Sequence, residues 1–267
     1  MKTYKKKSFN PKKTYSGKKG SYWNTVQRRL KKDRLVTKPM LYRAIHKNEE
    51  TKIVCVEQNY TLYNSGISSN TEMSNVLPPV PNDTTASGRI GDSIRPVKLV
   101  IRGVMSYNSY NLLDSQMIIS RMFLVQQKGI RDANQKTSVS TSLLQFGATN
   151  TTFTGALLDI TRPQNTDLFT FFADKKHIFL KPYGINGTTA AGNMTSSDKS
   201  LVKYFTITLT QKQLPAVLKY SGSSSTNPSN FLPLLCVGYS YANNGSPDVA
   251  TTQIGISYTS TLYYKDA

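Results

Sequence analysis

Basic side chains interleaved with aromatic rings dominate the first 38 residues of the chain. This stretch holds 14 Lys and Arg against a single acid, Asp33, and so carries +13 of the chain's total net charge of +19. Lysine and arginine neutralise phosphates and release counterions, and exposed rings stack on unpaired bases. The stretch therefore predicts binding to a polyanion, with single-stranded nucleic acid as the best match.

The residues expected to contact nucleic acid are basic side chains, most of them in adjacent pairs, and two neighbouring rings. They are Lys5, Lys6, Lys7, Lys12, Lys13, Lys18, Lys19, Tyr22, Trp23, Arg28, Arg29, Lys31, Lys32 and Arg34. The run RRLKKDR also has the composition of a nuclear import signal, and one cationic segment can serve an import receptor and nucleic acid in turn. A membrane surface is the weaker alternative, because the stretch has no Leu- or Phe-rich face.

Residues that could support catalysis are few. The chain has only two histidines, His46 and His177, and no GxSxG, HExxH or CxxC motif. Most of its aspartates stand in predicted loops or turns, where Asp is favoured for its local hydrogen bonds. We expect no enzyme activity, no metal site and no cofactor.

Two cysteines, Cys55 and Cys236, lie in apolar, β-branched surroundings without metal-ligand spacing, and both are expected to be buried free thiols. Gly88 and Gly91 flank an arginine but do not form a phosphate-binding loop motif, so we interpret them as turn residues before a strand. The chain contains no run of about 18 apolar residues, so we expect no membrane insertion.

The elements that follow the basic stretch are strands and long loops. Tyr, Thr, Ser and Asn are abundant, which favours strands and turns over helices. Strands are expected at 52–63, 93–106, 116–127, 201–210, 215–220, 232–241 and 253–264, with a hairpin-like pair at 168–172 and 177–181 around the turn 173–176. Long loops are expected at 64–91, 128–166 and 184–199.

Eight or nine strands with very unequal loops predict an all-β fold, a single eight-stranded jelly-roll sandwich rather than an up-and-down barrel. The basic stretch has too few apolar residues and too much self-repulsion to fold alone. We therefore divide the chain into a disordered basic N-terminal arm, residues 1–45, and a sandwich domain, residues 46–267.

Several segments together resemble the capsid proteins of small circular, Rep-encoding single-stranded DNA viruses, the circovirus-like group. They are the basic, Tyr-containing arm, the approach SGRIGDSIRPVKLVIRG with Arg89, Gly91 and Ile94, the segment LFTFFADKKHIFL, and the stretch FTITLTQKQLPAVLKYSG with the strands that follow it. The resemblance covers most of the chain.

This resemblance implies a jelly-roll subunit that self-assembles into an icosahedral T=1 shell of 60 copies. It further implies an inward-facing arm that packages viral single-stranded DNA, nuclear import of the new subunit, attachment of the virion to a host receptor, and location in the virion and, during assembly, the host nucleus. Two alternatives stay open. One is a non-assembling nucleic-acid-binding β-sandwich, such as a movement or packaging factor. The other is a carbohydrate-active enzyme, for which the sequence offers no paired carboxylates.

Overall fold

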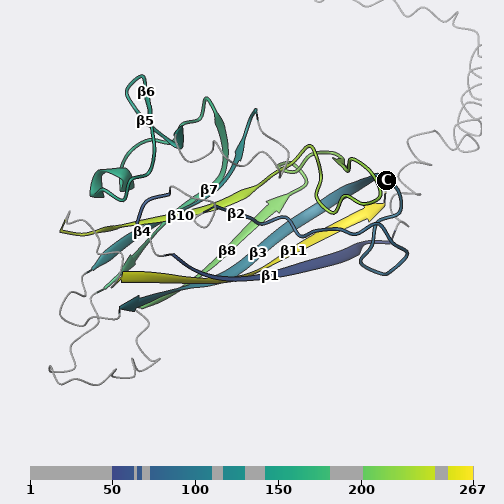
Figure 1. Ribbon diagram of the computed structural model, residues 1–267, viewed down its shortest axis with the longest axis horizontal. Helices are drawn as coiled ribbons and strands as arrows, with labels where there is room; N and C mark the ends of the chain where they lie inside the picture. The colour runs from purple at the N-terminus through teal and green to yellow at the C-terminus, as the bar shows by residue number, and fades with distance from the viewer. Residues whose placement is uncertain are drawn as a thin grey trace, which may run out of the picture. The chain divides into compact units, whose positions relative to one another are not determined.

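Two antiparallel sheets pack face to face in the computed structural model, which describes residues 50–62, 65–67, 73–109, 117–129, 142–180, 201–243 and 252–266 (Figure 1). Sheet A has the order β1-β11-β3-β8, with the short β9 also paired to β3; sheet B has the order β2-β10-β4-β7. Sheet A contains β1 (Lys52–Leu62), β11 (Thr252–Asp266), β3 (Ser93–Ser109), β8 (Val202–Thr210) and β9 (Leu218–Lys219). Sheet B contains β2 (Met73–Asn75), β10 (Leu234–Tyr241), β4 (Ile118–Gln127) and β7 (Phe169–Phe179).

The strand orders are those of a jelly roll. Numbered by chain order, the eight principal strands lie 1-8-3-6 in sheet A and 2-7-4-5 in sheet B, and every pairing is antiparallel. This is two interlocked Greek keys folded into a sandwich. The predicted all-β, eight-stranded sandwich is therefore confirmed.

The main core lies between the sheets and follows the alternation of the strands. In β3, Leu99, Ile101 and Met105 point inward and are fully buried. Gly103 lies in the same inward row. A Cβ at that position would lie 2.5 Å from the Phe205 ring and 2.6 Å from Tyr258 Cβ. The close approach of the Phe205 ring and of Tyr258 Cβ therefore requires glycine.

A second core covers the outer face of sheet B. The excursion between β4 and β7 contains the hairpin β5 (Leu144–Phe146) and β6 (Thr149–Thr151) and the 3-10 helix η3 (Leu157–Ile160). Apolar side chains from this excursion, including Phe153, pack on outward residues of β4 and β10, such as Phe123 and Cys236. Both faces of β10 are consequently covered, which explains why every one of its residues is buried, whereas Ile178 of the edge strand β7 is 51% exposed.

A buried arginine fixes the chain just before β3. Arg89 is fully buried, and its guanidinium donates to the carbonyl oxygens of Gly91, Gly222 at 2.7 Å and Ser225 at 2.9 Å. It also lies 4.3 Å from the centre of the Tyr220 ring. Gly91 has φ +88°, a conformation that favours glycine, which confirms it as a turn residue.

Several predictions were wrong in detail. The segments expected as a hairpin form one continuous strand, β7. The polar residues expected to form its turn lie within the strand, where Asp174 pairs with Arg121 of β4. The expected loop 64–91 contains β2, and the polar connection after β4 contains β5 and β6. Cys236 is buried as expected, but Cys55 is exposed, because it lies on the open side of the edge strand β1.

Candidate nucleic-acid interface

The basic and aromatic residues predicted to bind nucleic acid all fall within residues 5–34 and lie outside the described residues, as does His46. Their prediction therefore stands on the sequence alone. Within the described part of the chain, the surface that best suits a nucleic-acid strand is the outer face of sheet A. Sequence reasoning did not single out this surface.

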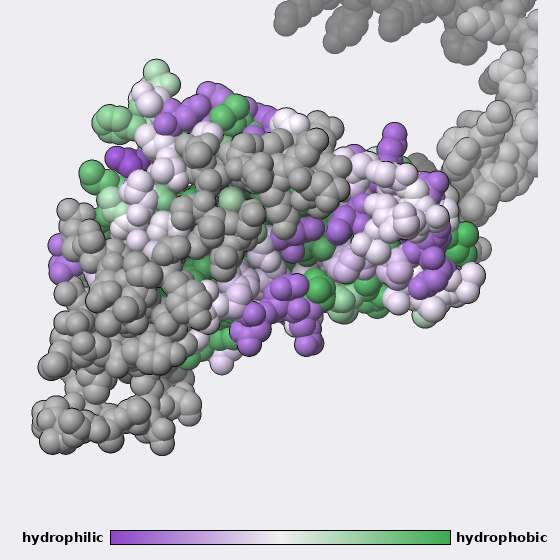
Figure 2. Space-filling view, viewed as in Figure 1, coloured by the Kyte–Doolittle hydropathy of each residue, from purple (hydrophilic) through white to green (hydrophobic). Residues whose placement is uncertain are grey.

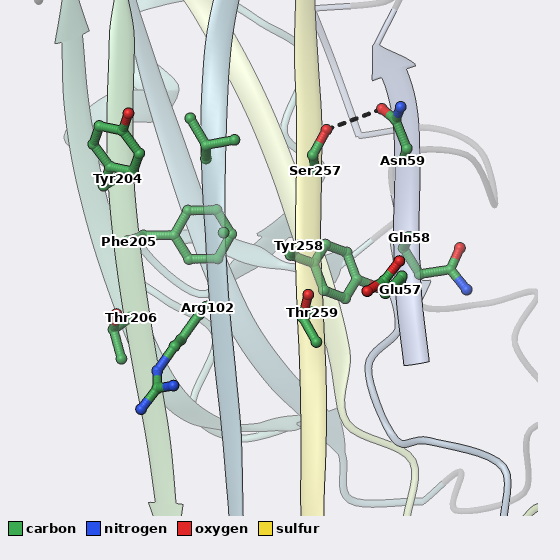
Figure 3. A pocket seen from close by; sticks show the side chains of 12 residues that line it. Glu57, Gln58, Asn59, Arg102, Tyr204, Phe205, Thr206, Ser257, Tyr258 and Thr259 are labelled. Atoms are coloured by element: carbon green, nitrogen blue, oxygen red, sulfur yellow. Dashed lines mark hydrogen bonds between the residues drawn. The ribbon is translucent and has the colours of Figure 1, made fainter. Parts of the chain in front are cut away.

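The strand register places polar side chains in two rows across the outer face of sheet A. One row is Asn59–Ser257–Val104–Tyr204, and the next is Glu57–Thr259–Arg102–Thr206. Figure 3 shows these side chains around a shallow hollow of about 740 Å³. Ser257 Oγ donates to Asn59 Oδ1 at 3.1 Å and holds the β1 side of the hollow in place.

Tyr204 and Arg102 are the residues of this face best suited to bind nucleic acid. The Tyr204 side chain is 82% exposed, which is unusual for an aromatic ring in the middle of a strand. Arg102 is exposed, and none of the described residues forms an ion pair with it. An exposed ring offers a stacking platform for a base, and a nearby guanidinium offers donors to a phosphate.

Two further rows of the same face add hydroxyls and one more cation. They are Cys55–Thr261–Val100–Thr208 and Ile53–Tyr263–Lys98–Thr210. Lys98 Nζ lies 4.1 Å from the centre of the Tyr263 ring, a cation–π contact that holds the ammonium on the face. Across the four rows, Lys98 and Arg102 are the cations and Glu57, on the edge strand, is the acid.

The alternation of β3 and β8 was the signal that could have identified this face. Apolar residues at every second position in 93–106 and 201–210 predict which side faces the core, and Tyr204 then falls on the opposite side. What the pattern does not contain is the order of strands, which brings Arg102 and Tyr204 into adjacent rows. In the view of Figure 2, hydrophilic and hydrophobic residues are interspersed over the described surface.

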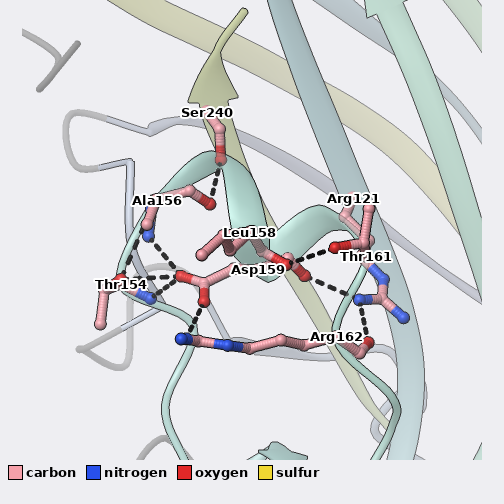
Figure 4. Close-up of polar contacts among 9 residues, drawn as sticks. Arg121, Thr154, Ala156, Leu158, Asp159, Thr161, Arg162 and Ser240 are labelled. Atoms are coloured by element: carbon pink, nitrogen blue, oxygen red, sulfur yellow. Dashed lines mark hydrogen bonds and ion pairs between the residues drawn. The ribbon is translucent and has the colours of Figure 1, made fainter. Parts of the chain in front are cut away.

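A second group of polar residues lies around η3 and has a structural role. Asp159 is buried, and its Oδ2 accepts from Thr154 N and Oγ1, each at 2.7 Å, and from Gly155 N at 3.1 Å (Figure 4). Its Oδ1 pairs with Arg162, and Ser240 Oγ donates to Ala156 O at 2.9 Å. This carboxylate is committed to hydrogen bonds that shape the turn.

Arg121 joins this group to sheet B. It is 3% exposed and donates to Asp159 O and Arg162 O, each at 2.7 Å, and to the Asp174 carboxylate, the shortest contact being 2.7 Å. Burial opposes ionisation of Asp174, but hydrogen bonds from Arg121 and Gln164 outweigh it and hold the pKa of that carboxyl below its ordinary value. The pair therefore anchors η3 to the sheet.

The described residues contain no cluster of three or more His, Cys, Asp or Glu side chains able to hold a metal ion. They also contain no helix that is both long and apolar enough to span a membrane.

Comparison with known proteins gives only distant structural likeness. No family model matches the chain, and no curated protein matches it. A crystal structure of the 60-mer BFDV capsid protein matches with 11% identity and a TM-score of 0.29, over 82% of this chain and 94% of that one. The infectious bursal disease virus VP2 subviral particle matches with 9% identity and a TM-score of 0.25, over 82% of this chain and 38% of that one. Both TM-scores lie below 0.5, so this likeness carries no weight for function.

Proposed function

We propose that this chain is a viral capsid protein that assembles with copies of itself into a closed icosahedral shell and packages single-stranded DNA through its basic arm. The observation that carries the proposal is the joining of a jelly roll to a basic arm, whose first 38 residues alone have a net charge of +13. Jelly rolls also occur in lectins and cupins, so the fold by itself does not decide the function. Neither of those functions calls for a concentrated polycation at one end of the chain.

The outer face of sheet A supports the same function. Tyr204 and Arg102 suit a base and a phosphate, and the threonines around them suit any nucleotide sequence. A packaging protein has to hold a genome without selecting short sequences, so this chemistry matches the task. We assign the face the part of a weak second contact, with the arm supplying most of the affinity.

The finer features of the proposal come from the resemblance noted in the sequence. They are a shell of 60 subunits, import of the new subunit into the nucleus by way of RRLKKDR, and a host receptor bound by the loops. In this proposal the protein carries out no catalysis.

The first test is electron microscopy of the expressed full chain, together with its ratio of absorbance at 260 and 280 nm. We expect particles of uniform size that contain nucleic acid. Removing residues 1–38 should leave particles that are empty. A chain that stays monomeric at every salt concentration and pH, with and without DNA, would refute the capsid proposal and leave the non-assembling DNA-binding protein.

The second test separates the arm from the face by the salt dependence of binding to oligothymidylate, under conditions that keep subunits apart. If all 13 net charges of residues 1–38 engage phosphates, the slope of log Kobs against log salt is about −9. Without the arm, Lys98 and Arg102 alone predict a slope of about −1.4. In that shortened chain, Arg102→Gln should halve the remaining slope. Lys212→Gln, which removes an exposed lysine in a turn, is the matched control and should leave the slope unchanged.

A further inference from the structure

The edge of the sandwich where β7 and β8 meet brings three basic side chains together. Lys175 and His177 alternate along β7 in step with Phe179 and so point between the sheets. Lys203 of β8 is in step with Phe205 and points into the same space. Lys175 Nζ donates to Thr206 O at 2.7 Å and so spans from one sheet to the other.

Two buried polar atoms lie beside these basic groups without a partner among the described residues. They are His177 Nε2 and Ser120 Oγ. Ser120 is fully buried, and the register places it directly opposite His177 on the same face of sheet B. A buried polar atom without a hydrogen bond costs about 1 to 3 kcal/mol. Two such atoms side by side therefore indicate a position that a bound molecule completes.

The charges that face His177 among the described residues are both positive. They are Lys175 on its own strand and Lys203 on β8. Asp174, the neighbouring acid of β7, points to the opposite face and is paired with Arg121. On the β10 side of Ser120 stands Tyr239, whose pKa is raised by burial, so it stays neutral. The space between the strands therefore has a positive potential and no anion among the described residues.

We propose that the β7–β8 edge is a binding site for a tetrahedral oxyanion of the phosphate class, held by Lys175, His177 and Lys203 and completed by Ser120. Lys175 uses one N–H on Thr206 and keeps two for a ligand. The site is independent of shell formation, because a single chain supplies all four residues. The anion is either a phosphodiester of packaged nucleic acid or a free phosphate, and both present the same oxygens.

Binding should take up a proton. Burial, and after it the positive charges of Lys175 and Lys203, lower the pKa of His177, so the free protein holds this ring neutral near pH 7. A bound anion favours the protonated ring, and each binding event then takes up part of a proton. Affinity should consequently rise as the pH falls.

The test is calorimetric titration of the full chain with sulfate, which does not titrate in this range, at about pH 7.5 and about pH 6 and at constant ionic strength. We expect tighter binding at the lower pH, with proton uptake that appears as a dependence of the heat on the buffer. Lys203→Gln should weaken binding about tenfold or more, and His177→Gln should remove the pH dependence. Lys212→Gln, in the exposed turn after β8, is the matched control: it removes one lysine outside the site and should leave the sulfate affinity unchanged. Sulfate that binds elsewhere, including on the arm, contributes equally in all of these variants.

Oligothymidylate added to the sulfate-loaded protein identifies the source of the anion. If oligothymidylate displaces sulfate from the wild type but not from Lys203→Gln, the site belongs to a phosphodiester. If sulfate stays bound to the wild type, the site belongs to a free oxyanion. Equal sulfate affinity in the wild type, Lys203→Gln and Lys212→Gln would overturn the proposal and leave water as the partner of Ser120 and His177. Melting curves in chloride verify that each variant is folded, and the partly exposed Lys203 provides the test if His177→Gln does not fold.

Discussion

Replacing Arg121 with methionine tests whether one guanidinium holds the β4–β7 excursion on sheet B. Methionine fills a similar length but removes every donor. The change leaves Asp174, whose side chain is 19% exposed, without its cation. It also removes the hydrogen bonds that Arg121 donates to the carbonyl oxygens of Asp159 and Arg162. Breaking a buried ion pair by removing one partner costs about 3 to 5 kcal/mol. Each carbonyl left unpaired adds about 1 kcal/mol where water cannot reach it.

Asp174 keeps its hydrogen bond from Gln164, so the lower end of the ion-pair range applies. With the two carbonyls, we expect Arg121→Met to lower the free energy of unfolding by about 5 kcal/mol, a large part of the stability of a typical domain. The measurement is urea unfolding at neutral pH, at a concentration too low for subunits to associate, since association would add apparent stability. Adding Asp174→Asn to this variant should recover part of the loss by removing the unpaired charge. The double variant should remain destabilised, because the two carbonyls are still without their donor.

The control is Arg102→Met, which removes an exposed arginine and should change stability by no more than about 0.5 kcal/mol. Hydrogen exchange locates the effect. The amides of Thr161 and Arg162, both bonded to Leu158 O at 3.0 Å, should exchange faster in Arg121→Met, and those of β11 should change less. If Arg121→Met costs no more than the control, Arg121 does not anchor η3 and the reasoning is wrong.

Three further outcomes follow from individual residues. Native protein should react with one equivalent of a thiol reagent, at the exposed Cys55, and with a second only after unfolding, because burial raises the pKa of Cys236 to about 12. Because the pKa of Asp174 in the folded protein lies below its ordinary value of 3.8, its stabilising effect is present above that pH and is lost as the pH falls further. Melting temperatures of the wild type and Asp174→Asn should therefore differ most near neutral pH and converge in acid. Gly103→Val should destabilise by about 1 to 3 kcal/mol in chemical unfolding, because its Cβ meets the Phe205 ring; an unchanged midpoint would contradict the packing described.

Strands that carry alternation along their whole length could be predicted from the sequence. The segments expected at 93–106, 201–210 and 253–264 correspond to β3, β8 and β11, and their ends differ by three residues or fewer. In β8 and β11, and in β3 from Leu99 onward, every second residue lies on the side that faces the other sheet; a bulge at Val97 shifts the alternation earlier in β3. The local pattern was enough because, within the described part of the chain, one face of sheet A is buried and the other is open.

Polar positions that depend on distant partners could not be predicted in this way. The sequence ADKK in β7 has the composition of a turn, yet Asp174 is matched by Arg121, 53 residues earlier in the chain, and Lys175 by the backbone of β8. Cys55 was misplaced for a related reason. Its β-branched neighbours indicate a strand, but only the strand order shows that β1 is an edge whose odd positions face outward.

The contrast between the two sheets bears on where the proposed contact with nucleic acid lies. Among the described residues, the central strands β4 and β10 of sheet B are packed on both faces, against sheet A on one side and the β4–β7 excursion on the other. Among the same residues, sheet A is covered on one side only, and its outer rows carry threonines, Tyr204, Lys98 and Arg102. Hydroxyls, a ring and two separated cations do not form a pattern of donors and acceptors that matches particular bases. A surface of this kind holds any single strand weakly, so in the proposed shell this face adds to the affinity of the arm through the number of subunits along the genome.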